Sequence, residues 1–206
     1  MKTIISILFC FLMVQPLCAQ SPATYAAYLA DGNYKELWKK EVAARASAVE
    51  QAPDKSNRYA LALSHLGLLS ATMRDQDEDL FDDYYDDAVD NLEDLIKLDK
   101  KWAEPPAVLS AIYGLKMGYS PWQGMFLGPK SNGLIEKAKD LDPNSPLVWK
   151  VYANAKFFTP EMWGGDLNEA IESYEKSVAL FEKKSDQLTN NWLYLEALAF
   201  QSQADS

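Results

Sequence analysis

The stretch from Leu147 to Lys183 most constrains the fold, because it contains two apolar stripes with the spacing of helices, joined by a short break. An α-helix brings residues three and four apart onto one face. Aromatic and small side chains follow that spacing on both sides of the break, at Trp149, Tyr152, Ala153, Ala170, Tyr174 and Ser177. The stretch therefore predicts two helices that pack their stripes together, with the small residues where the backbones approach closely.

The same spacing recurs elsewhere in the chain, at Ala88, Leu92 and Leu95, and again near Ile135. Together with Asp142-Pro143 before the main stretch, the pattern resembles the tetratricopeptide repeat (TPR), a helix-turn-helix unit about 34 residues long. This resemblance implies an all-α, TPR-like solenoid of about four helix pairs. The approximate repeats are 24–53, 58–101, 105–143 and 146–184, and a capping helix over 190–204, with a polar end, closes the array.

The first residues have the layout of a secretory signal peptide over 1–19, with the positive Lys2, an apolar run and the small Ala19. The apolar run is shorter than the about 20 residues of a membrane span, so we expect cleavage and no stable membrane insertion. The mature protein, 20–206, is then a single exported domain, periplasmic or secreted. Lipid anchoring at Cys18 is the alternative, but Leu17 stands where lipoprotein signals have a small residue.

The net charge and the cysteine content limit which reactions and which classes of partner are possible. Both cysteines, Cys10 and Cys18, lie in the predicted signal peptide, so the mature chain has no thiol for disulfides or nucleophilic catalysis. The net charge of −10, without a basic cluster, disfavours nucleic acid and anionic membranes as partners. Basic partners are favoured.

No catalytic or metal-binding motif is present. The chain has no nucleophile elbow and no phosphate-binding glycine loop, and its one histidine, His65, has no cysteine to share a zinc ion. The acidic run 75–87 alternates like the start of an EF-hand, but Leu80 replaces the required glycine and Asp86 the bidentate glutamate. We interpret the run as a solvated acidic linker, and we expect no enzymatic activity and no cofactor.

The third and fourth predicted pairs share an insertion between their two helices. GYSPWQGMFLGPKS and FFTPEMWGGD both place a proline after a helix, then large apolar side chains, then glycine. The second form also looks like a loop in the periplasmic TPR subunit associated with TRAP transporters. Either these loops fold back over the helix pairs, or they offer an apolar contact surface. The residues concerned are Trp122, Met125, Phe126, Met162 and Trp163. The second helix of the third pair is expected to begin near Gly133.

A second candidate surface comes from the family resemblance. TPR arrays generally bind peptides or proteins on the concave face formed by the first helix of each pair. By repeat position, that face would present Ser64, Leu68, Leu115, Lys150, Asn154 and Phe157. It lacks the lysine and arginine clamp that captures acidic peptide ends in some TPR domains.

These patterns lead to one functional hypothesis and two alternatives. The chain is expected to be an exported, non-enzymatic adaptor or scaffold that binds a protein or peptide partner. The first alternative is a periplasmic subunit of a TRAP-like solute-uptake system that binds a small apolar ligand. The second is a structural component of the cell envelope.

Overall fold

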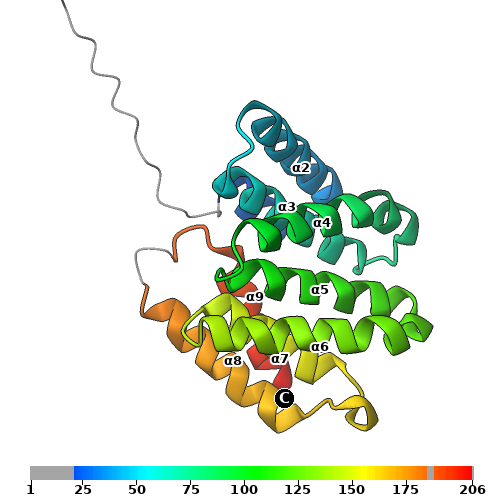
Figure 1. The fold of residues 1–206 in the computed structure, drawn as a ribbon, viewed down its shortest axis with the longest axis vertical. Helices are drawn as coiled ribbons and strands as arrows, with labels where there is room; N and C mark the ends of the chain where they lie inside the picture. Colours follow the sequence, from blue (N-terminus) through cyan, green and yellow to red (C-terminus); the bar gives the residue numbers. More distant parts are fainter. Residues whose placement is uncertain (1–20, 185–187, 206) are drawn as a thin grey trace, which may run out of the picture.

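The chain is all-α, as predicted. The computed structural model describes residues 21–184 and 188–205, and the regular elements within them are helices (Figure 1). The predicted signal peptide, with Cys10 and Cys18, lies outside the described residues. The α-helices are α1 (Pro22–Leu29), α2 (Tyr34–Gln51), α3 (Lys55–Thr72), α4 (Glu78–Leu98), α5 (Glu104–Tyr119), α6 (Gly124–Leu141), α7 (Pro146–Phe158), α8 (Leu167–Glu182) and α9 (Trp192–Ala204). Two short 3₁₀ helices, η1 (Pro121–Gln123) and η2 (Glu161–Trp163), precede α6 and α8.

Consecutive helices pack as four pairs, α1 with α2, α3 with α4, α5 with α6, and α7 with α8. The first helices also contact one another along the stack, α1 with α3, α3 with α5 and α5 with α7. Among the described residues, the second helices α2, α4, α6 and α8 make no such contacts with each other. Each second helix also contacts the first helix of the next pair, α2 with α3, α4 with α5 and α6 with α7, so both sets of contacts hold the stack together. The row of first helices contributes much of the buried core.

Helix α4 begins ten residues before the predicted start at Ala88, so most of the expected acidic linker is helical. Phe81, Tyr84 and Tyr85 extend the apolar stripe of this helix toward its N-terminus, and Phe81 is fully buried. Asp77 caps the helix by accepting a hydrogen bond from the backbone N–H of Leu80. Carboxylates in the first turn are favourable at a helix N-terminus, so the acidic residues support this helix.

Helix α6 also begins earlier than predicted, at Gly124 instead of near Gly133, although Pro129 lies inside it. The added turns are tied to α5 by two buried serines. Ser110 donates to the carbonyl of Ser131, and Ser131 donates to the carbonyl of Ser110, each at 3.0 Å. This reciprocal pair satisfies polar groups in the helix interface, which offsets the unfavourable glycine and proline content of the segment.

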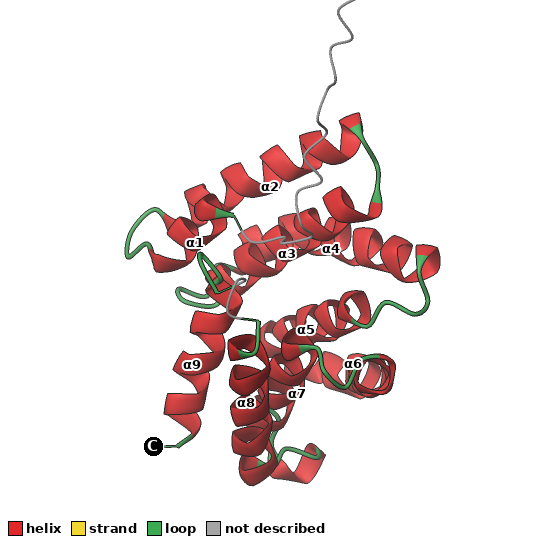
Figure 2. Ribbon diagram, turned by 90° about the vertical axis from the view of Figure 1, so that its left-hand side faces the viewer, coloured by secondary structure: helices red, strands yellow, loops and turns green. Residues whose placement is uncertain are grey.

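The C-terminal helix α9 contacts α8 and α7 and also reaches α1, at the start of the chain (Figure 2). The buried Trp192 packs edge-on against Trp38 of α2, with 5.3 Å between ring centroids, and lies 5.8 Å from the ring of Tyr28. The predicted closing helix thus joins the first pair to the last. No helix in the described part of the chain combines the length and the apolar character needed to cross a membrane.

Candidate functional site

The turn between α7 and α8 is fixed by backbone hydrogen bonds. Pro160 prevents α7 from continuing, and its carbonyl accepts from the N–H groups of Trp163, at 2.8 Å, and Gly165, at 3.2 Å. Gly164 adopts a positive φ of 97°, which favours glycine. A Cβ at Gly165 would lie 1.7 Å from the carbonyl oxygen of Thr159, so only glycine fits there. The turn therefore has one well-defined path.

Side chains on both flanking helices support the same turn. The Lys156 ammonium contacts the Glu169 carboxylate at 2.8 Å and donates to the carbonyl of Gly164 at 3.3 Å. The Tyr152 hydroxyl donates a short hydrogen bond to the same carboxylate. The hydrogen bond from Lys156, followed by that from Tyr152, lowers the pKa of Glu169. These contacts join the end of α7 to the start of α8, on either side of η2.

The turn between α5 and α6 is built on a similar plan. Helix α5 ends at Tyr119, directly before Ser120-Pro121, and η1 follows. The N–H of Gln123 donates to the carbonyl of Ser120 at 2.9 Å. As predicted, Pro121 and Pro160 follow the ends of their helices. Both turns lie at the same side of the molecule, on the right in Figure 1.

The five predicted insertion residues are all solvent-exposed, so they do not fold back over the helix pairs. Their exposed fractions lie between 61% for Phe126 and 84% for Met162. Phe158 and Leu167, at the adjoining helix ends, are also exposed large apolar side chains. We call the seven residues the turn edge: Trp122, Met125, Phe126, Phe158, Met162, Trp163 and Leu167.

The exposed apolar side chains are unevenly distributed over the molecule. Besides the turn edge, the exposed large apolar side chains among the described residues are Leu29 and Leu98. Leu29 ends α1, before the turn of the first pair, and Leu98 ends α4, at the opposite end of a pair. Isolated exposed apolar residues are common, but seven of them on two turns at the same side of the molecule are typical of an interaction surface.

The predicted concave face is largely inaccessible. Ser64 and Leu68 are buried in α3, so these two predicted contact residues cannot meet a partner in this conformation. Lys150 is also buried, because its ammonium forms an ion pair with the carboxylate of Glu196 on α9. Lys150 is covered by α9, which lies against α7, whereas Ser64 and Leu68 are covered within the stack, where α3 packs against α1, α2, α4 and α5. The prediction that Ser64, Leu68 and Lys150 line an accessible contact surface is therefore wrong.

The other three predicted groove residues are partly exposed and are engaged within the fold. Leu115 packs against the main core. Asn154 accepts a hydrogen bond from the Tyr174 hydroxyl at 2.7 Å. Phe157 packs edge-on against Phe158, with 4.9 Å between centroids. Leu115 and Asn154 are therefore engaged within the fold, and Phe157 borders the turn edge through Phe158.

Carboxylates from α4 lie next to the turn edge. The Lys116 ammonium of α5 contacts Asp82 at 2.6 Å, and the Tyr119 ring lies 4.8 Å from that of Phe81. These contacts place the start of α4 beside the end of α5. Burial, with the neighbouring carboxylates Asp77, Asp75 and Glu78, raises the pKa of Tyr119, although its hydrogen bond to Thr72 opposes the shift.

His65 is buried in α3, and its Nδ1 has no hydrogen-bond partner. Burial lowers the pKa of His65 to about 4, and the charge of Asp87 only partly opposes this effect. Within residues 21–184 and 188–205, no group of three or more histidine, aspartate or glutamate side chains is placed to hold a metal ion. The described side chains that are grouped and accessible are those of the turn edge.

Sequence reasoning missed Phe158, Leu167 and the flanking carboxylates. It assigned Phe157 to a contact surface, whereas the next residue, Phe158, is the exposed one. The proximity of α4 depends on contacts between distant residues and had no local signal.

Comparison with known proteins gives a structural match without a sequence match. No protein-family model and no curated protein sequence matches the chain. Among solved structures, the fold is similar to that of the HusA haemophore from Porphyromonas gingivalis, with a TM-score of 0.62 and 18% sequence identity. The match covers 85% of this chain and 95% of that chain. At this identity the likeness shows a shared helical fold, and the finer TPR and TRAP resemblances stay predictions.

Proposed function

We propose that this chain is an exported, non-enzymatic binding protein that contacts a protein partner through the turn edge. The observation that carries the proposal is the exposure of seven large apolar side chains on the α5–α6 and α7–α8 turns, which lie at the same side of the molecule (Figure 1). Tryptophan, phenylalanine and methionine are enriched among the residues that anchor protein interfaces.

The rigidity of the turns supports this role. Hydrogen bonds from Pro160 and the contacts of Lys156 hold the α7–α8 turn before any partner arrives. A preformed surface loses less conformational entropy when it binds. The proposed contact surface thus differs from the concave groove predicted from the TPR resemblance, and the partner is a folded protein or a segment of one.

The test is in-cell cross-linking followed by pull-down, with wild type compared with a Trp122→Ala/Trp163→Ala double variant. Leu98→Ala is the matched control, because Leu98 is similarly exposed but lies away from the turn edge. Circular dichroism checks that each variant is folded. The proposal expects one protein to be recovered with wild type and with the control and lost from the double variant. Equal recovery with all three chains would contradict it.

A second candidate is the capture of haem or a related flat, apolar ligand, within a solute-uptake system. The observation that favours it is the structural similarity to a haemophore. The aromatic rings of the turn edge would stack on such a ligand. The carboxylates beside Tyr119 disfavour its propionate groups, so we rank this candidate second.

Titration with haemin, followed through the Soret band and tryptophan quenching, tests this candidate. Saturable binding at one equivalent, weakened in the Trp122→Ala/Trp163→Ala variant and unchanged in Leu98→Ala, would support it. Spectra identical to those of free haemin would exclude it.

A further inference from the structure

We propose that the turn edge, if it is the binding surface inferred above, recognises a basic amphipathic segment of its partner. In this arrangement, apolar side chains of the segment pack on the turn edge, and its lysines or arginines face the carboxylates of α4. The inference deepens the proposed function by naming the chemistry of the partner.

The acidic half of the surface is a row on α4. Glu78, Asp82 and Asp86 are four residues apart and therefore share one helix face. Asp82 contacts Lys116 of α5, so this face is directed toward the end of α5, a few residues before Trp122. Glu78 and Asp86 are exposed, and neither has an ion pair in the described part of the chain.

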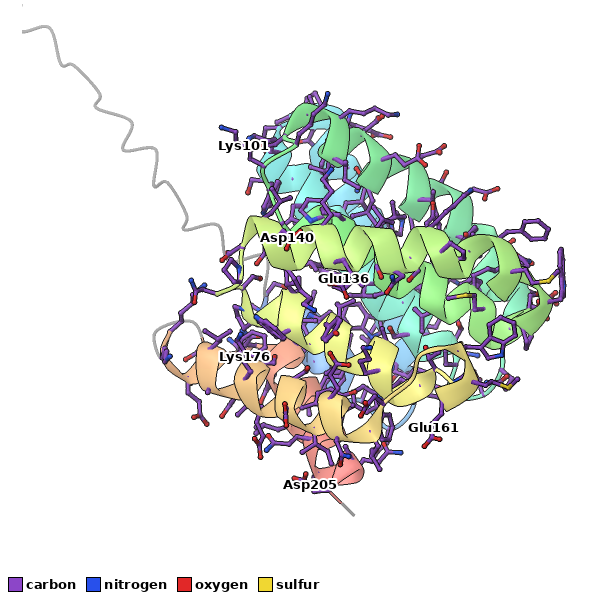
Figure 3. All side chains as sticks on the ribbon, turned by 60° about the horizontal axis from the view of Figure 1, so that its bottom comes forward. Lys101, Glu136, Asp140, Glu161, Lys176 and Asp205 are labelled. Carbon is purple, nitrogen blue, oxygen red and sulfur yellow. The ribbon has the colours of Figure 1, made fainter. Side chains whose placement is uncertain are left out.

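A second acidic side chain, Glu161, lies beside the apolar half of the surface. Glu161 belongs to η2, next to Met162, and is exposed without an ion pair among residues 21–184 and 188–205. Figure 3 shows Glu161 at the α7–α8 turn, away from Asp140 near the far end of α6. Carboxylates therefore lie near the exposed apolar side chains of both turns.

Most nearby cations are already engaged within the fold. Lys35 contacts Asp75 and Asp77, each at 2.6 Å, while Lys116 and Lys156 contact carboxylates of α4 and α8. Two nearby cations have no carboxylate partner among the described residues: Lys130, exposed in α6, and Arg74, which donates to the carbonyls of Tyr28 and Ala30. The surface thus carries excess negative charge beside apolar area, which attracts a cationic partner and repels an anionic one.

An uncharged lipid surface would also accept exposed tryptophan and methionine side chains, but it would gain nothing from the carboxylates. An anionic lipid surface would be repelled by them. Dependence of binding on Glu78 and Asp86 therefore separates a basic protein segment from a bilayer.

The probe is an 18-residue synthetic peptide with leucine and lysine at helical spacing, and its control has glutamate in place of lysine. Binding is measured by calorimetry at low and at high salt. We expect the lysine peptide to bind at least tenfold tighter than the glutamate peptide. Its affinity should fall at least tenfold in the Trp122→Ala/Trp163→Ala variant and remain unchanged in Leu98→Ala.

The charge contribution is tested with Glu78→Gln/Asp86→Asn. Its matched control, Glu50→Gln/Asp140→Asn, removes the same charge from exposed carboxylates at the opposite ends of α2 and α6. We expect the first variant to lose at least threefold in affinity and to show a weaker salt dependence, and the control to behave as wild type.

Equal losses in both charge variants would mean attraction by net charge alone and would overturn the inference. Sedimentation with phosphatidylcholine vesicles that depends on the two tryptophans but not on the two carboxylates would overturn it in favour of a lipid surface. If the pull-down recovers an edge-dependent partner while the lysine peptide binds no better than the glutamate peptide, the proposed function stands and only this inference fails.

Discussion

A methyl group at Gly67 is expected to destabilise the protein, because this glycine of α3 lies directly under the ring of Trp38. A Cβ built there would come within 2.3, 2.4 and 2.6 Å of three ring atoms. The Trp38 ring cannot retreat easily, since it is buried and packs against Trp192 at 5.3 Å. Gly67→Ala therefore forces either the ring or the backbone to move.

The size of the effect follows from two opposing contributions. Overpacking a core costs about 1–3 kcal/mol, and contacts this short place the cost near the upper end. Replacing glycine by alanine inside a helix stabilises the folded protein by about 1 kcal/mol. The expected net loss is about 2 kcal/mol, and for an m-value of about 2 kcal/mol/M it lowers the urea midpoint by about 1 M.

Gly114 supplies the matched control, because it lies inside α5, is exposed, and a Cβ there would meet nothing within 4 Å. Gly114→Ala should stabilise the protein by about 0.5–1 kcal/mol. Both variants are measured by urea unfolding followed by circular dichroism. The Trp38→Leu substitution should be less harmful in the Gly67→Ala background than alone. A Gly67→Ala protein as stable as wild type would show that the Trp38 ring does not resist the added methyl group.

Three further predictions concern other parts of the molecule. Since burial holds the pKa of His65 near 4, below its unfolded value of about 6.5, the unfolded state binds the extra proton between these values. Stability should therefore fall by about 3 kcal/mol as the pH drops from 6.5 to below 4, and His65→Gln should remove this part of the pH dependence of the urea midpoint. Lys150→Met should lower the free energy of unfolding by about 3 kcal/mol, because it leaves the largely buried Glu196 carboxylate unpaired. In the same assay, the free energy of unfolding of Lys150→Met/Glu196→Leu should lie within about 1 kcal/mol of the wild-type value. Gly165→Ala should displace the turn from the Thr159 carbonyl and reduce partner recovery in the pull-down, without changing the helical circular dichroism signal.

The helical architecture could be predicted because its signals are local. The small residues Ala153 and Ala170 are fully buried where the sequence predicted two helices to approach closely. Gly67 and Gly114 show the limit of this reasoning. Both precede the end of a first helix by a few residues, but only Gly67 lies under a tryptophan, and the position of that tryptophan depends on the packing of α2.

The starts of α4 and α6 were misplaced because local residue preferences conflicted with tertiary contacts. The run 75–87 is acidic and 124–133 contains glycine and proline, so both were assigned to connecting segments. Burial of Phe81 and the pairing of Ser110 with Ser131 outweigh those preferences. Each of these contacts involves a second helix, which a local pattern does not show.

The candidate site was predictable in its residue types but not in its accessibility. The sequence identified the two proline turns and their five large apolar side chains, and left open whether they fold back. The hydrogen bonds at Pro160 and the Lys156 contacts decide this for the α7–α8 turn. The concave face failed as a prediction because neighbouring helices of the stack bury Ser64 and Leu68 of α3, and because α9 lies against α7, where Glu196 pairs with Lys150.

The most direct test of the central claim places a photoreactive amino acid at single positions of the otherwise unchanged chain. Benzoylphenylalanine would replace Trp163 on the turn edge, and in a second protein it would replace Leu98, an exposed residue away from that edge. After irradiation in cells, we expect one discrete cross-linked product from position 163 and none of that size from position 98. The same product from both positions, or from position 98 alone, would contradict the assignment of the turn edge as the binding surface.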